Sequence, residues 1–203
     1  MPAGSVTRRM FSLAAVGLLL ATTGCVKLGS KPPEKLLGIE SQARLAPGTT
    51  QSGAPLSALF VEIPGVPKAI DTQRVAVRTD PNSYAYVKKA LWVDTPARQF
   101  QALLSETLAA KTGRLVLDPS QYPAQVGQVL HGDLVEFGVD ARSARAVVTF
   151  DASLLAPDGK TVRRQRFSAS RPLREIDENS VAPAISDAAN EVAAGIAEWI
   201  AQP

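Results

Sequence analysis

QVLHGDLVEFGVD (residues 128–140) and RAVVTFDASLL (145–155) are the two segments that decide the fold. Both are rich in aliphatic, aromatic and β-branched residues, and both are long enough for strands that run the length of a sheet. The turn sequence APDGK (156–160) follows, and its Asp-Gly pair favours a hairpin into a further strand over 161–169. We therefore expect three consecutive strands in an antiparallel meander.

The apolar residues of segment 128–140 change phase in its middle. Leu130 and Leu134 share one side of an ideal strand, whereas Val135, Phe137 and Val139 share the other. A β-bulge near Leu134 would bring both sets to the same face of the sheet.

Two helices are predicted to cover this sheet. In the first, Thr95 is the expected cap, Pro96 occupies the first helical position, and Gly113 stands where a left-handed stop is needed. The second runs over 180–201. Each carries one apolar stripe at three-and-four spacing: Phe100, Leu103, Leu104, Thr107 and Leu108 in the first, and Ile185, Ala188, Val192, Ile196 and Trp199 in the second.

Shorter apolar runs supply the remaining strands. We expect strands over 35–39, 59–63, 74–78 and 114–117, and two short extended pieces over 84–87 and 90–93. Strands, a helix, more strands and a closing helix predict an α/β fold. It is a single domain with a mixed, largely antiparallel sheet packed against two main helices.

The amino terminus has the layout of an export signal. Arg8 and Arg9 precede an apolar run over 11–21, and small residues lead to Cys25, the only cysteine of the chain. The apolar run is shorter than the ~20 residues that a membrane-spanning helix needs. The arginines resemble a twin-arginine signal, and the general secretory (Sec) route remains the alternative.

Thr22-Thr23-Gly24-Cys25 resembles the lipobox of bacterial lipoproteins. This predicts cleavage after Gly24 and attachment of diacylglycerol and an N-acyl chain to Cys25, which would anchor the protein on a membrane. Val26 replaces the aspartate that commonly retains lipoproteins in the inner membrane, so we expect the periplasm-facing side of an outer membrane. The predicted parts are a signal peptide (1–24), a lipidated tether (25–34) and one domain (35–203).

Composition excludes several classes of function. Without the two arginines of the signal, the formal charge falls from +3 to +1, and aromatic residues make up only 5%. Neither value favours a nucleic-acid partner. One histidine and one acylated cysteine cannot form a disulfide or a His/Cys metal cluster. We expect no cofactor beyond the acyl chains.

The segment DTQRVAVR (71–78) identifies a family. Together with Asp80-Pro81-Asn82, Tyr86, Trp92 and the helix from Pro96, it resembles the ABC-type transport auxiliary lipoproteins over about residues 33–200. The resemblance implies an α/β domain with a mixed sheet. It also implies a non-catalytic lipoprotein of a lipid-transport system, in which an ABC permease and ATPase act with a mammalian-cell-entry (MCE) substrate-binding protein. The lipoprotein would contact membrane lipids and the MCE protein.

No catalytic constellation emerges from the remaining polar residues. His131 is isolated and is more simply explained as a strand histidine bonded to a neighbour than as a general base. Asp133, Glu136 and Asp140 could be imagined as a carboxylate site, but we interpret them as a solvated strand edge.

Two groups of residues are candidate contact sites. Arg163, Arg164 and Arg166 belong to a basic run, continued by Arg171 and Arg174, that either protects a sheet edge or binds lipid phosphates or an acidic partner surface. Tyr84, Tyr86 and Trp92 either form an exposed anchor patch or, in the case of Trp92, pack in the core.

The sequence therefore favours a docking lipoprotein that holds an MCE-type conduit at the outer membrane. The alternatives are a carrier that holds an acyl chain in a pocket under the sheet, and a cell-envelope assembly accessory lipoprotein. Whether the chain forms a homo-oligomer is left open.

Overall fold

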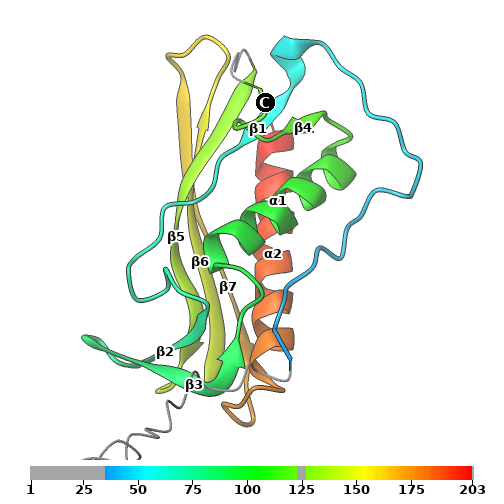
Figure 1. Cartoon of the computed structure of the whole chain (residues 1–203). Coiled ribbons are helices and arrows are strands. Elements are labelled where there is room, and N and C mark those ends of the chain that lie inside the picture. The colour runs from blue at the N-terminus through cyan, green and yellow to red at the C-terminus, as the bar shows by residue number, and fades with distance from the viewer. Residues whose placement is uncertain (1–34, 123–126, 203) are drawn as a thin grey trace, which may run out of the picture. The chain divides into compact units, whose positions relative to one another are not determined.

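The computed structural model describes residues 35–122 and 127–202 (Figure 1). These residues belong to one compact unit. In chain order the elements are η1 (Pro55–Ser57), β1 (Leu59–Val61), β2 (Arg74–Asp80), β3 (Ser83–Leu91), α1 (Pro96–Thr112), β4 (Val116–Leu117), β5 (Gln128–Asp140), β6 (Arg145–Leu155), β7 (Val162–Pro172) and α2 (Val181–Ala201). The mixed seven-stranded sheet with two helices confirms the predicted fold class.

Strand β5 is the centre of the sheet. On one side it pairs along its length with β6, which in turn pairs with β7, so the predicted antiparallel meander is confirmed. On its other side β5 pairs in parallel with β1 at residues 128–130 and with β2 at residues 138–140. The register between β5 and β6 shifts between Leu134 and Glu136, which is the predicted bulge. The bulge lies between the stretch of β5 that pairs with β1 and the stretch that pairs with β2.

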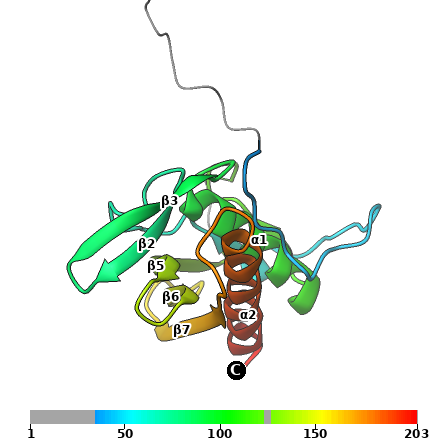
Figure 2. The ribbon, with the colours of Figure 1, turned by 90° about the horizontal axis from the view of Figure 1, so that it is seen from below.

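Both helices cover the same face of the sheet. Helix α2 packs on β5, β6 and β7 as well as on α1, and seen from below the two helices lie to one side of the meander (Figure 2). The predicted stripe of α2 is buried throughout, as is that of α1. Phe100 of α1 meets Phe150 of β6 with ring centroids 5.2 Å apart, and both side chains are almost fully buried. The main core therefore lies between the sheet and the helices.

The ends of α1 agree with the expected signals in part. Pro96 begins the helix and Gly113 ends it at φ 68°, in the left-handed region. Thr95 occupies the cap position, but its side chain makes no capping hydrogen bond. Instead Asp94 Oδ1 accepts the backbone N–H of Thr95 at 2.6 Å.

Several minor strands differ from the prediction. Segment 35–39 is not a strand: only Leu37 forms a bridge, to Trp92. The two extended pieces over 84–87 and 90–93 belong largely to the single strand β3, which carries a wide bulge because Ala76 pairs with Tyr86 whereas Arg74 pairs with Leu91. Strand β4 has only two residues, and β7 extends further than predicted, to Pro172.

Candidate docking surface

The face of the sheet opposite the helices carries an apolar row at one end. Five residues on adjacent strands pair directly with one another across the sheet, in the order Leu117, Phe60, Val129, Leu155 and Val162. Phe60 and Val129 are buried, with Ala58, in a satellite cluster separate from the main core. From Val129 on β5 the exposure of these side chains increases toward β7 at the edge of the sheet, where Val162 is 54% exposed. We call these five residues the apolar row.

The next rows on this face are polar. Arg166 donates from Nε and one terminal nitrogen to the two carboxylate oxygens of Asp151, both at 2.6 Å. These hydrogen bonds from Arg166 hold the pKa of the Asp151 carboxyl below its ordinary value, and burial opposes the shift. Arg164, opposite Ser153 in the register, is exposed and has no ion pair within residues 35–122 and 127–202. Arg164 is therefore a cation on this face available to a partner.

The three candidate arginines do not form one patch. Arg163 pairs with Leu154 in the register and faces the helices. Its guanidinium lies 5.0 Å from the ring centre of Trp199 and donates to the carbonyls of Trp199 and Gln202. It thereby binds carbonyl groups at the end of α2, where a cation is favourable. Strand β7 pairs only with β6, so the arginines do lie on a sheet edge.

The carboxylates of β5 do not lie on a sheet edge, because β5 is central in the sheet, although Asp133 is exposed to solvent as expected. Glu136 and Asp140 both bind Arg78 of β2, at 2.6 and 2.7 Å. The hydrogen bond from Arg78 is the main cause that lowers the pKa of Asp140, and the same bond raises the pKa of Arg78. Glu136 also accepts a hydrogen bond from Thr149. These contacts connect β2 to β5 and leave no free carboxylate pair among them.

The predicted aromatic patch is wrong for Trp92. Its side chain is fully buried and packs on Phe137 with ring centroids 5.6 Å apart. Of the two alternatives for Trp92, packing in the core therefore holds, with Phe137 of β5 on its ring and Leu37 bridged to its backbone. Tyr84 is 48% exposed. Tyr86 is half-buried under the guanidinium of Arg74, 4.0 Å from the ring centre, and its hydroxyl donates to the carbonyl of Ala69.

His131 has the neighbour that the sequence interpretation expected. Its Nδ1 lies 2.7 Å from a carboxylate oxygen of Glu62 on the extended chain that follows β1. Within residues 35–122 and 127–202, no three His, Cys, Asp or Glu side chains gather as a metal site would require. None of the helices in those ranges has the length and apolar character of a membrane span.

The predicted lipidation and export residues lie outside the described part of the chain. These are Arg8, Arg9, Gly24 and Cys25. Their roles stay predictions.

Sequence reasoning missed the apolar row and the link between Arg78 and the β5 carboxylates. Both join strands that are far apart along the chain. Only one pair of the apolar row could have been predicted from the sequence. Leu155 and Val162 flank the Asp-Gly turn, and a hairpin places such flanking residues opposite each other.

Comparisons with known proteins agree with this fold. A model of the family described as "ABC-type transport auxiliary lipoprotein component" matches residues 41–197. No curated protein matches the chain. The protein XCC0632 of Xanthomonas campestris, of family DUF330, has 20% identity and a TM-score of 0.63 over 81% of this chain and 94% of its own. A crystal structure of an uncharacterised protein has 17% identity and a TM-score of 0.64 over 82% and 97% of the two chains.

Proposed function

Because the chain belongs to the family of ABC-type transport auxiliary lipoprotein components, we propose that it docks an MCE-type lipid conduit at the outer membrane. In this role it is a non-catalytic part of the transporter, and an ATPase subunit hydrolyses the ATP. The observation that carries the proposal is the family match over residues 41–197, which spans every strand, α1 and α2 up to residue 197.

The membrane side of this function rests on Cys25. A thiol carrying diacylglycerol and an N-acyl chain would hold the domain on the periplasm-facing side of the outer membrane, since each buried methylene contributes ~0.8 kcal/mol. A signal of either the twin-arginine or the Sec type would export the chain.

The partner side of this function rests on the uncovered face of the sheet. The apolar row emerges at the edge of the sheet at Val162, and Arg164 lies two residues further along the same strand and on the same face. An exposed aliphatic side chain beside an arginine without an ion pair, among the residues that the structure describes, suits a partner surface that is apolar and acidic. The MCE-domain protein of the same transport system is the partner that we propose for this surface.

Co-purification tests this assignment. The MCE protein is immobilised, and the mature chain with Cys25→Ser is applied as a soluble partner. The double variant Val162→Glu/Arg164→Glu should bind at least about ten-fold more weakly, because it removes an apolar contact and reverses a charge. The pair is preferable to Arg166→Glu, which would also break the ion pair with Asp151.

A matched control is available on the same chain. Val93 is 55% exposed, almost the same as Val162 at 54%, and Lys111 is an exposed cation on α1. Val93→Glu/Lys111→Glu should leave binding unchanged. Equal binding by both double variants would show that the partner does not bind at Val162 and Arg164 of β7.

Among residues 35–122 and 127–202, no contact favours the carrier alternative. Beneath the sheet, the space that an acyl chain would occupy contains Phe100, Phe137 and Phe150, all with at most 1% exposure. The interior there is packed by the protein's own side chains.

A further inference from the structure

The described chain begins beside the end of β3. Leu37 donates its N–H to the carbonyl of Leu91, and its own carbonyl accepts the N–H of Val93. Lys35 donates to the side-chain carbonyl of Asn179, in the loop before α2, at 2.6 Å. These bonds fix the point at which the tether joins the domain.

The tether limits how far this point can lie from the lipid anchor. Residues 25–34 connect Cys25 to Lys35. Ten residues span at most ~36 Å when fully extended. In a domain anchored at Cys25, the end of β3 therefore lies within ~36 Å of the membrane surface.

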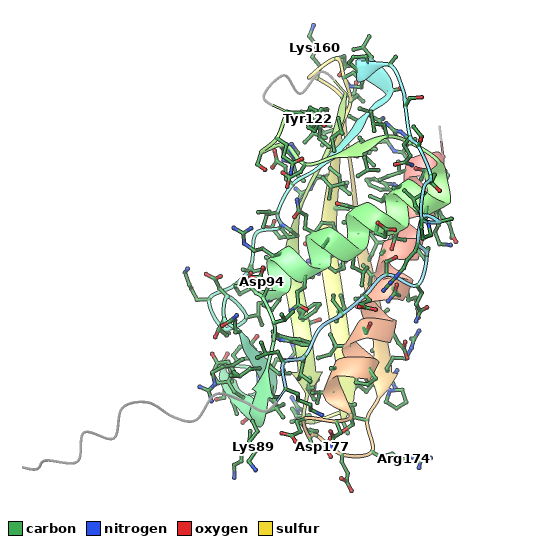
Figure 3. All side chains as sticks on the ribbon, turned by 45° about the vertical axis from the view of Figure 1, so that its right-hand side comes forward. Lys89, Asp94, Tyr122, Lys160, Arg174 and Asp177 are labelled. Atoms are coloured by element: carbon green, nitrogen blue, oxygen red, sulfur yellow. The ribbon has the colours of Figure 1, made fainter. Side chains whose placement is uncertain are left out.

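The surface around the junction has exposed aliphatic and basic side chains. Leu36 and Val93 are 51% and 55% exposed. Lys88 and Lys89 are exposed within the wide bulge of β3, where Lys89 has a left-handed φ of 59°. A bulge commonly redirects side chains in this way. Figure 3 shows Lys89 at the end of the domain opposite Lys160 and Tyr122. We call Leu36, Lys88, Lys89 and Val93 the tether-side surface.

We propose that the tether-side surface lies against the bilayer, with Leu36 and Val93 in the headgroup region and Lys88 and Lys89 on the phosphates of anionic lipids. The inference rests on the proposed anchorage at Cys25 and adds an orientation to it. Strand β3 faces the membrane, and the β6–β7 hairpin with the apolar row faces away from it. Aliphatic side chains flanked by lysines are the combination that binds at a membrane interface.

The neighbouring charges are compatible with this orientation. Neither Lys88 nor Lys89 has an ion pair within the described ranges. Three carboxylates are close along the chain or in space. Asp94 follows Val93 and accepts the N–H of Thr95, and Glu40 and Glu178 border the same surface hollow as Leu36. Glu40 is already in an ion pair with Arg44. The two lysines are therefore the cations of this surface that are free to meet lipid phosphates.

The test replaces the acyl chains so that it does not depend on lipidation. The mature chain with Cys25→Ser and an amino-terminal histidine tag is tethered to phosphatidylcholine vesicles that contain a nickel-chelating lipid, with or without phosphatidylglycerol. A single cysteine is introduced as Val93→Cys, two residues after the end of β3, or as Val162→Cys, at the start of β7; the two sites are of nearly equal exposure. Each carries a polarity-sensitive fluorophore.

We expect the label at position 93 to brighten and to become protected from an aqueous quencher on phosphatidylglycerol vesicles, while the label at position 162 stays accessible. Lys88→Glu/Lys89→Glu should lower the protected fraction about ten-fold or more, because each basic residue near an anionic surface contributes a factor of about five. The control variant Lys111→Glu/Lys160→Glu should leave the protected fraction unchanged.

Equal responses at positions 93 and 162 would overturn the proposal. So would protection at position 93 that is independent of phosphatidylglycerol and of the two lysines. Either outcome would leave the anchorage at Cys25 standing, because the tag supplies the attachment here. Failure of lipidation itself would appear only in the wild-type mature chain.

Discussion

Gly132→Ala should destabilise the fold by overpacking the core at the central strand. A Cβ at position 132 would lie 2.2 Å from Cζ of Phe150 and 2.5 Å from the carbonyl oxygen of Asp151. Neither neighbour can move freely, because Phe150 packs on Phe100 and Asp151 belongs to the β5–β6–β7 hydrogen-bonded ladder.

The expected loss follows from that geometry. Overpacking of this kind costs ~1–3 kcal/mol, and a contact to backbone as well as to a ring argues for about 2 kcal/mol. For a domain of this size the melting temperature should fall by roughly 4–8 °C. Urea unfolding of the mature chain with Cys25→Ser, followed by circular dichroism, measures the free energy of unfolding directly.

Two further variants make the measurement specific. Gly53→Ala is the control, since its Cβ would meet only the flexible Ser57 hydroxyl at 3.3 Å and Leu115 at 3.7 Å; its stability should stay within ~0.5 kcal/mol of wild type. Adding Phe150→Leu to Gly132→Ala should cost less than the two single changes summed, because the clashing ring is gone. A Gly132→Ala protein as stable as the control would refute the reasoning.

Three other predictions concern the core, the charged face and the interior. Trp92→Ala should lower the free energy of unfolding by ~3–5 kcal/mol, and Tyr84→Ala by less than ~0.5 kcal/mol; similar losses in urea titrations would contradict the burial of Trp92. Arg166→Gln should destabilise the fold only slightly at pH 7, because the Arg166 side chain of this ion pair is largely exposed. Arg166 depresses the folded pKa of Asp151, so this stabilisation is present above the unfolded value near ~3.9 and disappears as the pH falls through the folded value. Melting temperatures of wild type and variant should thus converge at acidic pH, and a constant difference would point to another cause. Native mass spectrometry of the Cys25→Ser chain should show no stoichiometric phospholipid; a one-to-one complex would favour the carrier function instead.

The main architecture follows from local sequence patterns. Strands β5 and β6 have the bounds that their apolar runs predict, because both are long and the hairpin after β6 has an unambiguous turn sequence. The bulge near Leu134 was predictable because a phase change in a buried strand must be absorbed somewhere. Helix α2 begins within one residue of the prediction because its stripe is continuous.

The rest depended on contacts between distant parts of the chain. Lys35–Ile39 looks like a strand, but only Leu37 finds a partner, and that partner is Trp92. The two extended pieces of β3 could not be joined from sequence, since the bulge at Lys88 and Lys89 depends on how β2 pairs. For the candidate site, the edge position of the arginines was predicted, but their division between two faces was not, because it depends on the register with β6.

The most direct test of the docking account is the mass of the amino-terminal peptide of the mature protein isolated from its membrane. The account predicts a chain that begins at Cys25 and carries diacylglycerol on the thiol and an acyl chain on the amino group. An unmodified Cys25, or a chain that begins at another residue, would contradict it.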